Sequence, residues 1–274
     1  MIPINTDTKL INSKHVVEEN CPSFSGIVAQ ECKGHLWVDD IEVPTLAIAE
    51  SYAVGSFAFL GTAQPKTALD RLKAFLENEL FIQLQKDGHT SFEFSIENEN
   101  LRKDLLAMFQ DKTIYTEQEH SFRIKSIPVI RKEIPKDYRI VKVDAEFWKQ
   151  LLEGRYDNAE FLTDRLLESW HSFEEFQNKS IAYCTLLNNR IVAVIVGTAH
   201  YKNIIPIDIE TEEAHRRKGL AYAMAAAFIE DCLQSNYIPQ WDCVESNQNS
   251  YHMACKLGFE KIHENTVYWF DFDE

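Results

Sequence analysis

A short basic turn between two apolar segments carries the clearest chemical signal in the sequence. Arg216, Arg217 and Lys218 stand directly before Gly219, at the start of a segment with helical periodicity. The first N–H groups of a helix have no partner within the helix, and together with the helix dipole they favour a bound anion. A glycine here lets a ligand come close to the backbone. These residues predict a pyrophosphate site, although a solvated basic helix start fits them equally well.

Other phosphate-binding signatures and a nucleic-acid role are excluded on simple grounds. Neither a GxxxxGK[ST] nor a GxGxxG string occurs in the chain. The net charge is -15, spread over both halves, and such a surface repels phosphate backbones. We therefore expect no nucleic-acid partner. An acidic surface suits cationic amines, although solubility alone accounts for the charge as well.

Cysteine spacing and hydropathy point to a cytoplasmic protein without a metal centre. The N-terminus has no basic and apolar leader, and the apolar runs are much shorter than the roughly 20 residues that cross a bilayer. We expect no membrane partner and no metal. The cysteines lack CxxC spacing and are interpreted as small core residues in a reducing compartment; they are Cys21, Cys32, Cys184, Cys232, Cys243 and Cys255.

The elements that must position the basic turn are predicted from periodicity. Over residues 138–272 the order is β-α-α-β-β-β-α-β-α-β, which means a mixed sheet with helices on both faces, an α/β fold of the mixed-sheet α+β type. The strands are expected at 138–143, 180–187, 190–200, 204–211, 239–244 and 266–272, and the helices at 145–154, 159–176, 219–235 and 249–257.

The first half of the chain has its own strands and helices. A Pro-containing, charged stretch at 126–136 is interpreted as a boundary, which divides the chain into domains 1–130 and 131–274. The first half is expected to hold a strand at 34–40, one bent or two short strands within 43–60, a helix at 66–84, a strand at 91–96, a helix at 98–109 and closing strands at 113–116 and 120–124.

At the basic turn the sequence resembles the GNAT acetyltransferase superfamily. The coenzyme-A loop of that family reads Arg/Gln-x-x-Gly-x-Gly/Ala, and residues 216–221 match it between a strand and a helix. Asn247-x-x-Ser250 and the closing Leu-Gly-Phe at 257–259 fit as well. Four segments look like a bacterial subfamily that includes the acetyltransferase giving resistance to zwittermicin A; they are 207–211, 215–221, 239–242 and 256–259.

The resemblance implies acetyl-coenzyme A as co-substrate. The loop backbone would bind the pyrophosphate, and the strand before it would pair with the pantetheine arm. In the family two strands separate beside this point, here those at 204–211 and 239–244, and the acetyl group lies in the gap. The residues given a cofactor role in this way are Ile209, Thr211, Arg216, Arg217, Lys218, Gly219, Leu220, Ala221 and Asn247.

Proton chemistry is where the sequence departs from the family. Many relatives carry a tyrosine acid four positions before the glycine of the Gly-Phe pair, and here that position is Ala254, which leaves Tyr251 or water. An attacking amine must also lose a proton. Glu210 is the first candidate base, followed by Asp208, Glu212 and Glu245. The scattered histidines His200, His215, His252 and His263 are interpreted as structural or solvated.

The resemblance therefore predicts an N-acetyltransferase acting on a primary amine of a small molecule. Two alternatives stay open: an enzyme with another acyl group or a protein amine as acceptor, and a non-catalytic sensor that binds acyl-coenzyme A. The first half has no RxxGxA string, yet its strands and helices echo the GNAT order loosely, so a degenerate copy of the fold is one interpretation. Its role would be a wall for the substrate, a surface for a homodimer, or stability.

Overall fold

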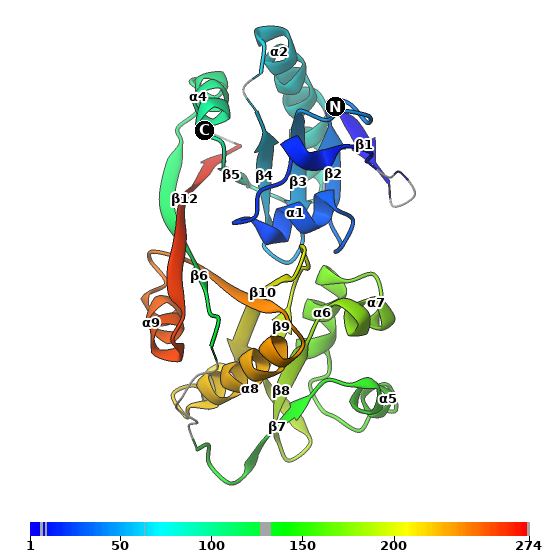
Figure 1. The fold of residues 1–274 in the computed structure, drawn as a ribbon, viewed down its shortest axis with the longest axis vertical. Helices are drawn as coiled ribbons and strands as arrows, with labels where there is room; N and C mark the ends of the chain where they lie inside the picture. Colours follow the sequence, from blue (N-terminus) through cyan, green and yellow to red (C-terminus); the bar gives the residue numbers. More distant parts are fainter. Residues whose placement is uncertain (6–7, 9, 63, 127–132, 273–274) are drawn as a thin grey trace. The chain divides into compact units, whose positions relative to one another are not determined.

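The chain divides into two compact units, and the first unit contains segments from both ends of the sequence (Figure 1). The computed structural model describes all residues except 6–7, 9, 63, 127–132 and 273–274. One unit comprises Met1–His120, Val244–Ser246 and Glu264–Glu274; the other comprises Ser121–Cys243 and Asn247–His263. The boundary expected at 126–136 falls largely on 127–132, outside the described residues, and the division into 1–130 and 131–274 stays a prediction.

The first unit is a mixed sheet in the order β1-β2-β3-β4-β5-β12. Its neighbours are antiparallel except β4 and β5, which are parallel. Its elements are β1 (Ile2–Ile4), η1 (Ser13–His15), α1 (Pro22–Val28), β2 (His35–Val38), β3 (Leu46–Ser51), β4 (Ser56–Gly61), α2 (Lys66–Phe75), the π-helical turn η2 (Leu76–Leu80), α3 (Phe81–Lys86), β5 (Ser91–Ile96), α4 (Glu99–Met108) and β6 (Tyr115–Arg123).

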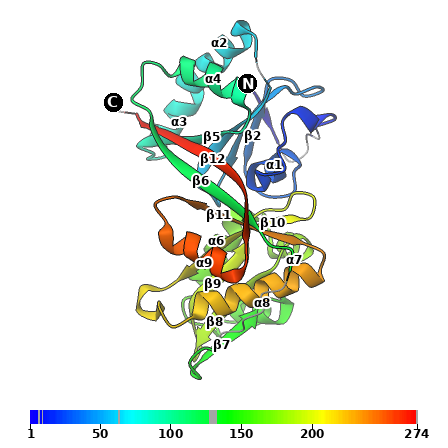
Figure 2. The same ribbon diagram turned by 60° about the vertical axis from the view of Figure 1, so that its left-hand side comes forward.

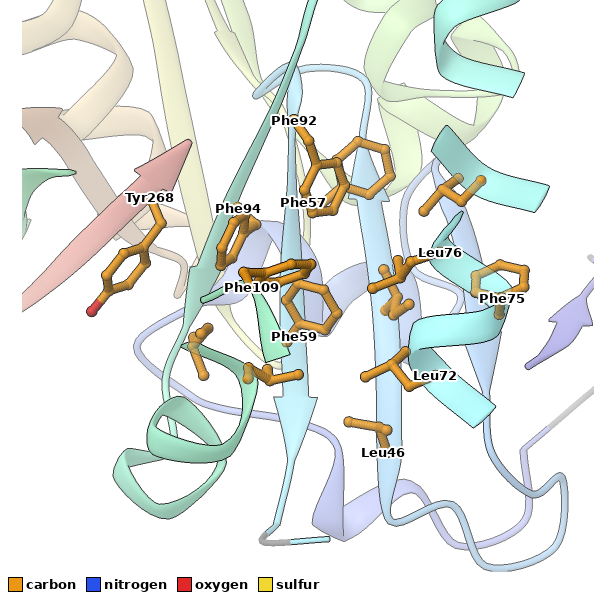
Figure 3. Packing of buried hydrophobic residues seen from close by; sticks show 14 of the residues in the cluster. Leu46, Phe57, Phe59, Leu72, Phe75, Leu76, Phe92, Phe94, Phe109 and Tyr268 are labelled. Atoms are coloured by element: carbon orange, nitrogen blue, oxygen red, sulfur yellow. The ribbon is translucent and has the colours of Figure 1, made fainter. Parts of the chain in front are cut away.

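Aromatic side chains from alternate positions of two strands form the core of this unit (Figure 3). Phe92 and Phe94 project from one face of β5, and their rings stack at 5.3 Å. Phe59 of β4 meets Phe94 edge-on at 5.5 Å. Leu72 and Leu76 close the cluster from the helical side, and all five side chains are buried. This face of the sheet is therefore filled by the chain itself.

The helix expected at 66–84 forms with a π-helical turn in its middle. Leu72, Leu76, Leu80 and Leu84 are four residues apart and are all buried. In a regular α-helix, residues at this spacing drift by about 40° per step. The wider turn η2 takes up part of this drift, so that the leucines keep facing the sheet.

The second unit contains the basic turn and a sheet in the order β11-β10-β9-β8-β7. Here β10 and β11 are parallel, and the other neighbours are antiparallel. The elements are β7 (Tyr138–Lys142), α5 (Ala145–Leu152), α6 (Glu160–Ser169), α7 (Phe173–Lys179), β8 (Ala182–Leu187), β9 (Arg190–Gly197), β10 (Ile204–Thr211), η3 (Glu213–His215), α8 (Leu220–Gln234), β11 (Ile238–Val244), α9 (Gln248–Leu257) and β12 (Glu260–Asp271). The predicted mixed α+β fold is confirmed.

Helices α8 and α6 cover opposite faces of this sheet (Figures 1 and 2). Ile209 of β10 packs in the cluster that holds Phe228 of α8. Its neighbour Glu210 instead pairs with Arg165 of α6. Since side chains alternate along a strand, odd-numbered positions of β10 face α8 and even-numbered positions face α6.

The two units repeat one order of elements. In each, three antiparallel strands lead through a helix to a parallel strand, and a capped helix and a long strand follow. Asn98 caps α4 through hydrogen bonds from Asn100 and Leu101, as Asn247 caps α9 through one from Ser250. The chain's last strand, β12, completes the sheet of the first unit by pairing with β5. This repetition supports the interpretation of the first half as a degenerate copy of the fold.

Several elements differ from the sequence-based expectation. The helix expected at 159–176 is two helices, because Trp170 takes an extended conformation and donates to the oxygen of Gly197 at 3.0 Å, while Ser172 caps α7. The closing strands expected at 113–116 and 120–124 are one strand, β6. The last strand starts at Glu260 rather than at residue 266, and β1 and α1 were not predicted.

The cap of α4 gives a test of the first unit's stability. Replacing Asn98 by Ala removes the acceptor for two N–H groups, so we expect the free energy of unfolding to fall by about 1 kcal/mol. Denaturant unfolding measures this change. Asn100→Ala, in the same exposed first turn but without a capping side chain, is the control and should leave stability nearly unchanged. An equal loss in both variants would contradict the capping role.

Candidate active site

The two parallel strands beside the basic turn stop pairing halfway along their length. The ladder between β10 and β11 runs from the pair Ile204–Ile238 to the pair Pro206–Gln240. Both strands continue, to Thr211 and Val244, and β10 keeps its pairing with β9 up to Thr211. Within the described residues, the β11-facing edge of residues 207–211 is thus left without β11 as a partner. An extended ligand can pair with such an edge as an added strand does.

The basic turn leads from this edge into the long helix α8. Arg217 and Gly219 both adopt the left-handed conformation, with φ values of 62° and 82°. Gly219 is the N-cap of α8, and the first bond of the helix runs from the N–H of Ala223 to the oxygen of Gly219. The N–H groups of residues 220–222 precede this bond and point out of the helix end. They form the anion-binding geometry that the sequence predicted.

The three cations of the turn are not equivalent. Lys218 donates to the hydroxyl of Tyr138 at 2.8 Å and to the oxygen of Ala214 at 3.1 Å. That hydroxyl also shares a hydrogen bond with Nδ1 of His215 at 2.9 Å. The Nε of Arg216 donates to the oxygen of Thr211, so these two cations brace the turn from within. In the described part of the chain Arg217 makes no hydrogen bond or ion pair, and it is exposed.

One buried hydroxyl beside the turn has no partner. Thr211 is 9% exposed, and its Oγ1 makes no hydrogen bond to any described residue. By strand alternation it lies on the α8 face, opposite Ala193 of β9. An unsatisfied buried hydroxyl costs about 1–3 kcal/mol, and a ligand group at the helix end would satisfy it. The turn and strand therefore fit the polar arm and pyrophosphate of coenzyme A.

Two carboxylates on the other face of β10 share one arginine. The guanidinium of Arg165, on α6, bonds both Asp208 and Glu210. It also lies 5.3 Å from the ring centre of Phe161 on the same helix. Two carboxylates and one guanidinium leave one net negative charge. The net negative charge on this face of β10 therefore attracts a further cation.

A shallow depression adjoins this cluster. It has a volume of about 310 Å³, and Arg165 forms part of its wall. Three of the six lining residues are acidic, so the depression is cation-attracting as well. The complete lining is Asn158, Glu160, Phe161, Asp164, Arg165 and Glu168.

The other candidate bases have different roles or places. Glu212 accepts from Arg190 at 2.6 Å and from Asn158 at 3.2 Å, so it ties the end of β10 to its surroundings. Glu245 belongs to the first unit, where its N–H donates to Gln118 at 2.8 Å. The geometry thus favours Glu210 and Asp208 over Glu212.

The residues around the usual tyrosine position are packed into the core. Ala254 is completely buried within α9. The ring of Tyr251 meets Phe122 edge-on at 5.3 Å and packs against the same hydrophobic cluster. Asn247 uses its side-chain oxygen to cap α9, at 3.1 Å from the N–H of Ser250. Its amide nitrogen remains as the group that can donate to a ligand.

Five of the six cysteines have the core role that their spacing indicated, and for Cys255 that expectation is wrong. Cys255 is exposed, whereas the other five are buried. Burial raises the pKa of the Cys184 thiol to about 12 and raises that of Cys232 as well. Neither forms a thiolate near neutral pH, so neither can serve as a nucleophile. In the described part of the chain no cluster of His, Cys, Asp and Glu is arranged to hold a metal ion, and no helix is long and apolar enough to span a membrane.

Sequence reasoning missed Arg165 and Tyr138. Arg165 looked like one more polar position of an amphipathic helix, and its partners lie 43 and 45 positions away. Tyr138 looked like the first residue of an edge strand, yet its hydroxyl holds Lys218, 80 positions away. No local pattern signals such pairs, because they arise only when α6 packs on β10 and when β7 joins the far end of the sheet by pairing with β8.

The first unit lacks both features of this site. Its parallel ladder, between β4 and β5, reaches Phe59 and Ile96, where β5 ends, so β5 does not diverge from β4 as β11 does from β10. Helix α2 starts with Pro65 at its N-cap, without a basic turn. The side chain of Gln64 donates back to the oxygens of Thr45 and Thr62.

Sequence comparison places this site in a known family. A profile of the GNAT acetyltransferase family matches residues 14–268, which extend over both units. The chain belongs to this family of N-acetyltransferases, enzymes that take an acyl group from acyl-coenzyme A. A curated relative from Bacillus subtilis strain 168, the uncharacterized N-acetyltransferase YdfB, is 35% identical over 102 residues. That match spans 37% of this chain and 39% of the relative's length.

Solved structures share the fold at low sequence identity. A GCN5-related N-acetyltransferase-like protein from Streptococcus suis 89/1591 superposes with a TM-score of 0.58 at 21% identity, covering 86% of this chain and 88% of that one. A tandem GNAT protein from the clavulanic acid biosynthesis pathway, in a form without AcCoA, gives 0.57 at 11% identity over 98% and 97% of the two chains. The second likeness agrees with a repeated fold along this chain.

The cofactor loop can be tested at its glycine. Gly219→Val places a branched side chain in the turn, so we expect the affinity for acetyl-coenzyme A to fall about tenfold or more, measured by calorimetry. Valine also strains a left-handed position. Gly154→Val is the matched control, since Gly154 has φ 74° and open space around its Cβ position. Unchanged affinity in Gly219→Val, or an equal loss in both variants, would remove the loop from the binding site.

Proposed function

We propose that the protein transfers an acetyl group from acetyl-coenzyme A to a primary amine on a small molecule. Family membership supports the transfer, and the turn and the free strand edge support the co-substrate. The resemblance to the subfamily with the zwittermicin A resistance enzyme supports a small acceptor. The net negative charge on the α6 face of β10 is the observation that supports an amine as the acceptor.

The proposed coenzyme-A site consists of backbone groups more than side chains. The N–H groups of Gly219, Leu220 and Ala221 at the start of α8 would receive the pyrophosphate, with Arg217 as the cation free to meet it. Lys218 and Arg216 hold the turn in place. The backbone of Ile209 and Thr211 would pair with the pantetheine arm, because the side chain of Ile209 is committed to the core. The amide nitrogen of Asn247 would contact the arm.

The proposed acceptor site is the cluster of Asp208, Glu210 and Arg165, which carries one net negative charge. An ammonium group placed there neutralises the remaining negative charge, and the acidic lining of the depression attracts it. An uncharged acceptor would gain nothing from this arrangement. The acceptor is therefore a cation before it reacts.

Glu210 is proposed as the base that takes the ammonium proton. An amine with a pKa near 10 is almost entirely protonated at neutral pH, so proton removal is needed before its lone pair attacks the thioester carbon. The C–N bond then forms and the C–S bond breaks. A thiol of pKa about 8.5 leaves readily as thiolate, and water carries the second proton of the attacking nitrogen to it, since Ala254 cannot donate one. Arg165 holds the carboxylate of Glu210 in its orientation.

The general-base role predicts a kinetic effect without a binding effect. Glu210→Gln should lower the turnover number by roughly a hundredfold and leave the calorimetric affinity for acetyl-coenzyme A unchanged. Glu153→Gln is the control, because Glu153 also pairs with an arginine, at 2.8 Å, but on the exposed end of α5. If the wild type and Glu210→Gln show the same pH–rate profile and plateau, Glu210 is not the base and Asp208 is the next candidate.

The same assay distinguishes the acceptor classes. Release of coenzyme-A thiol is followed with small amines, with an N-terminal peptide and with a lysine peptide. We expect turnover with small amines. Turnover with peptides alone would refute the proposed acceptor, and binding of the cofactor without turnover on any amine would support a sensor.

The missing features of the first unit predict one cofactor per chain. Calorimetric titration with acetyl-coenzyme A should give a stoichiometry of one, because the β4–α2 connection offers neither a basic turn nor a diverging strand. Gly219→Val serves as the internal check, since it should weaken that single binding event about tenfold or more and leave no second, unaffected one. A stoichiometry of two would show that residues 1–125 hold a second site.

A further inference from the structure

One face of the first unit's sheet carries polar groups where the other face carries phenylalanines. Ser95 and Glu93 alternate with the core residues of β5 and therefore point away from them. Their direct partners across the ladder are Val267 and Trp269 of β12. One step further along, Asn265 donates to Glu97 at 2.5 Å. These side chains line a continuous stretch of the β5–β12 pair.

Two deeply buried polar atoms in this stretch have no hydrogen-bond partner. Asn265 is 5% exposed and Ser95 is 6% exposed. The Oδ1 of Asn265 and the Oγ of Ser95 bond to no described residue. Because the nitrogen of Asn265 donates to a carboxylate, the orientation of its amide is fixed and its oxygen needs a donor. Each such buried group costs about 1–3 kcal/mol unless something satisfies it.

Aromatic and acidic groups stand beside these two atoms. The ring of Trp269 stacks on that of Tyr115 at 5.8 Å, with the planes 22° apart. Burial, and secondarily the charge of Glu117, raise the pKa of Glu93. The ionised form of this exposed side chain is therefore disfavoured beside Glu117. A cation near Glu93 would stabilise the ionised form, and an aromatic face next to it attracts cations too.

The groups in this stretch are chemically complementary to the same kind of ligand. An amide oxygen and a hydroxyl need hydrogen-bond partners, and the carboxylate of Glu93 beside stacked aromatic rings attracts a positive charge. We propose that this face of the first unit is a binding site for a protonated amine that also carries hydroxyl groups. The ammonium lies between Glu93 and Trp269, and the hydroxyl groups bond Ser95 and Asn265. The proposal uses no residue of the transfer site in the second unit.

A purely structural origin of these groups makes the opposite prediction for stability. Removing an unsatisfied buried hydroxyl relieves a cost, so Ser95→Ala should keep or raise the melting temperature of the ligand-free protein. If the hydroxyl serves a ligand, the same variant loses affinity. If Ser95→Ala keeps or raises the melting temperature of the ligand-free protein and lowers the affinity for the ligand, the hydroxyl of Ser95 acts in binding rather than in stability.

The experiment is calorimetry without acetyl-coenzyme A, in phosphate buffer, since Tris is itself a hydroxylated amine. The probes are ethanolamine and glucosamine, with glucose as the uncharged match and butylamine as the match without hydroxyl groups. We expect the hydroxylated amines to bind at least about tenfold more tightly than either match. Ser95→Ala and Asn265→Ala should each weaken that binding by about tenfold while the proteins stay folded.

Ser51→Ala is the matched control. Ser51 is 4% exposed in the same unit, but its hydroxyl accepts from the N–H of Val54 at 3.3 Å. This variant should lower the melting temperature and bind the amines as the wild type does. The proposal is overturned if the wild type does not distinguish hydroxylated amines from glucose and butylamine. Wild-type affinity in both Ser95→Ala and Asn265→Ala overturns it as well.

Discussion

The separation of β10 from β11 is the constraint on which the rest of the second unit depends. Past the pair Pro206–Gln240 the backbone edge of β10 has lost its strand partner, and an unpaired edge is costly unless a ligand or water satisfies it. The strand stays in place because β9 holds its other edge as far as Thr211. The turn that follows and the start of α8 then stand beside this edge, so one local break in a sheet creates the surface that we propose binds the cofactor.

The same order of elements gives a different outcome in the first unit. There the parallel ladder continues to Ile96, and the phenylalanines of β4 and β5 fill the helical side. Over the described residues of this unit no strand diverges from the parallel ladder, and the sequence before α2 has no basic turn. The chain thus holds two copies of one architecture. The second unit carries the proposed transfer site, and the first has polar side chains on the β5–β12 pair.

Local signals predicted most of the elements but not the contacts between them. The β-branched run predicted β10 at its observed ends, and Gly258 marked the end of α9 because it takes φ 92°. The loop was predicted from a six-residue string. The divided role of its cations was not, because the bond from Lys218 to Tyr138 depends on an edge strand 80 positions away. The single helix predicted at 159–176 is wrong because Trp170, although at helical spacing, is extended and donates its buried Nε1 to the oxygen of Gly197.

Arg165 changes how the candidate base must be understood. A guanidinium beside a single carboxylate would cancel its charge, and the pair would then not attract a cation. With Asp208 as a second partner, however, the guanidinium is shared, and the three groups keep one negative charge. An incoming ammonium completes a balanced set of two positive and two negative charges. As its proton leaves, that balance is lost unless a carboxylate takes the proton, so proton transfer to the Asp208–Glu210 pair preserves neutrality on this face. On the proposed mechanism Arg165 orients the carboxylate of Glu210, and Asp208 supplies the second negative charge that balances the incoming cation.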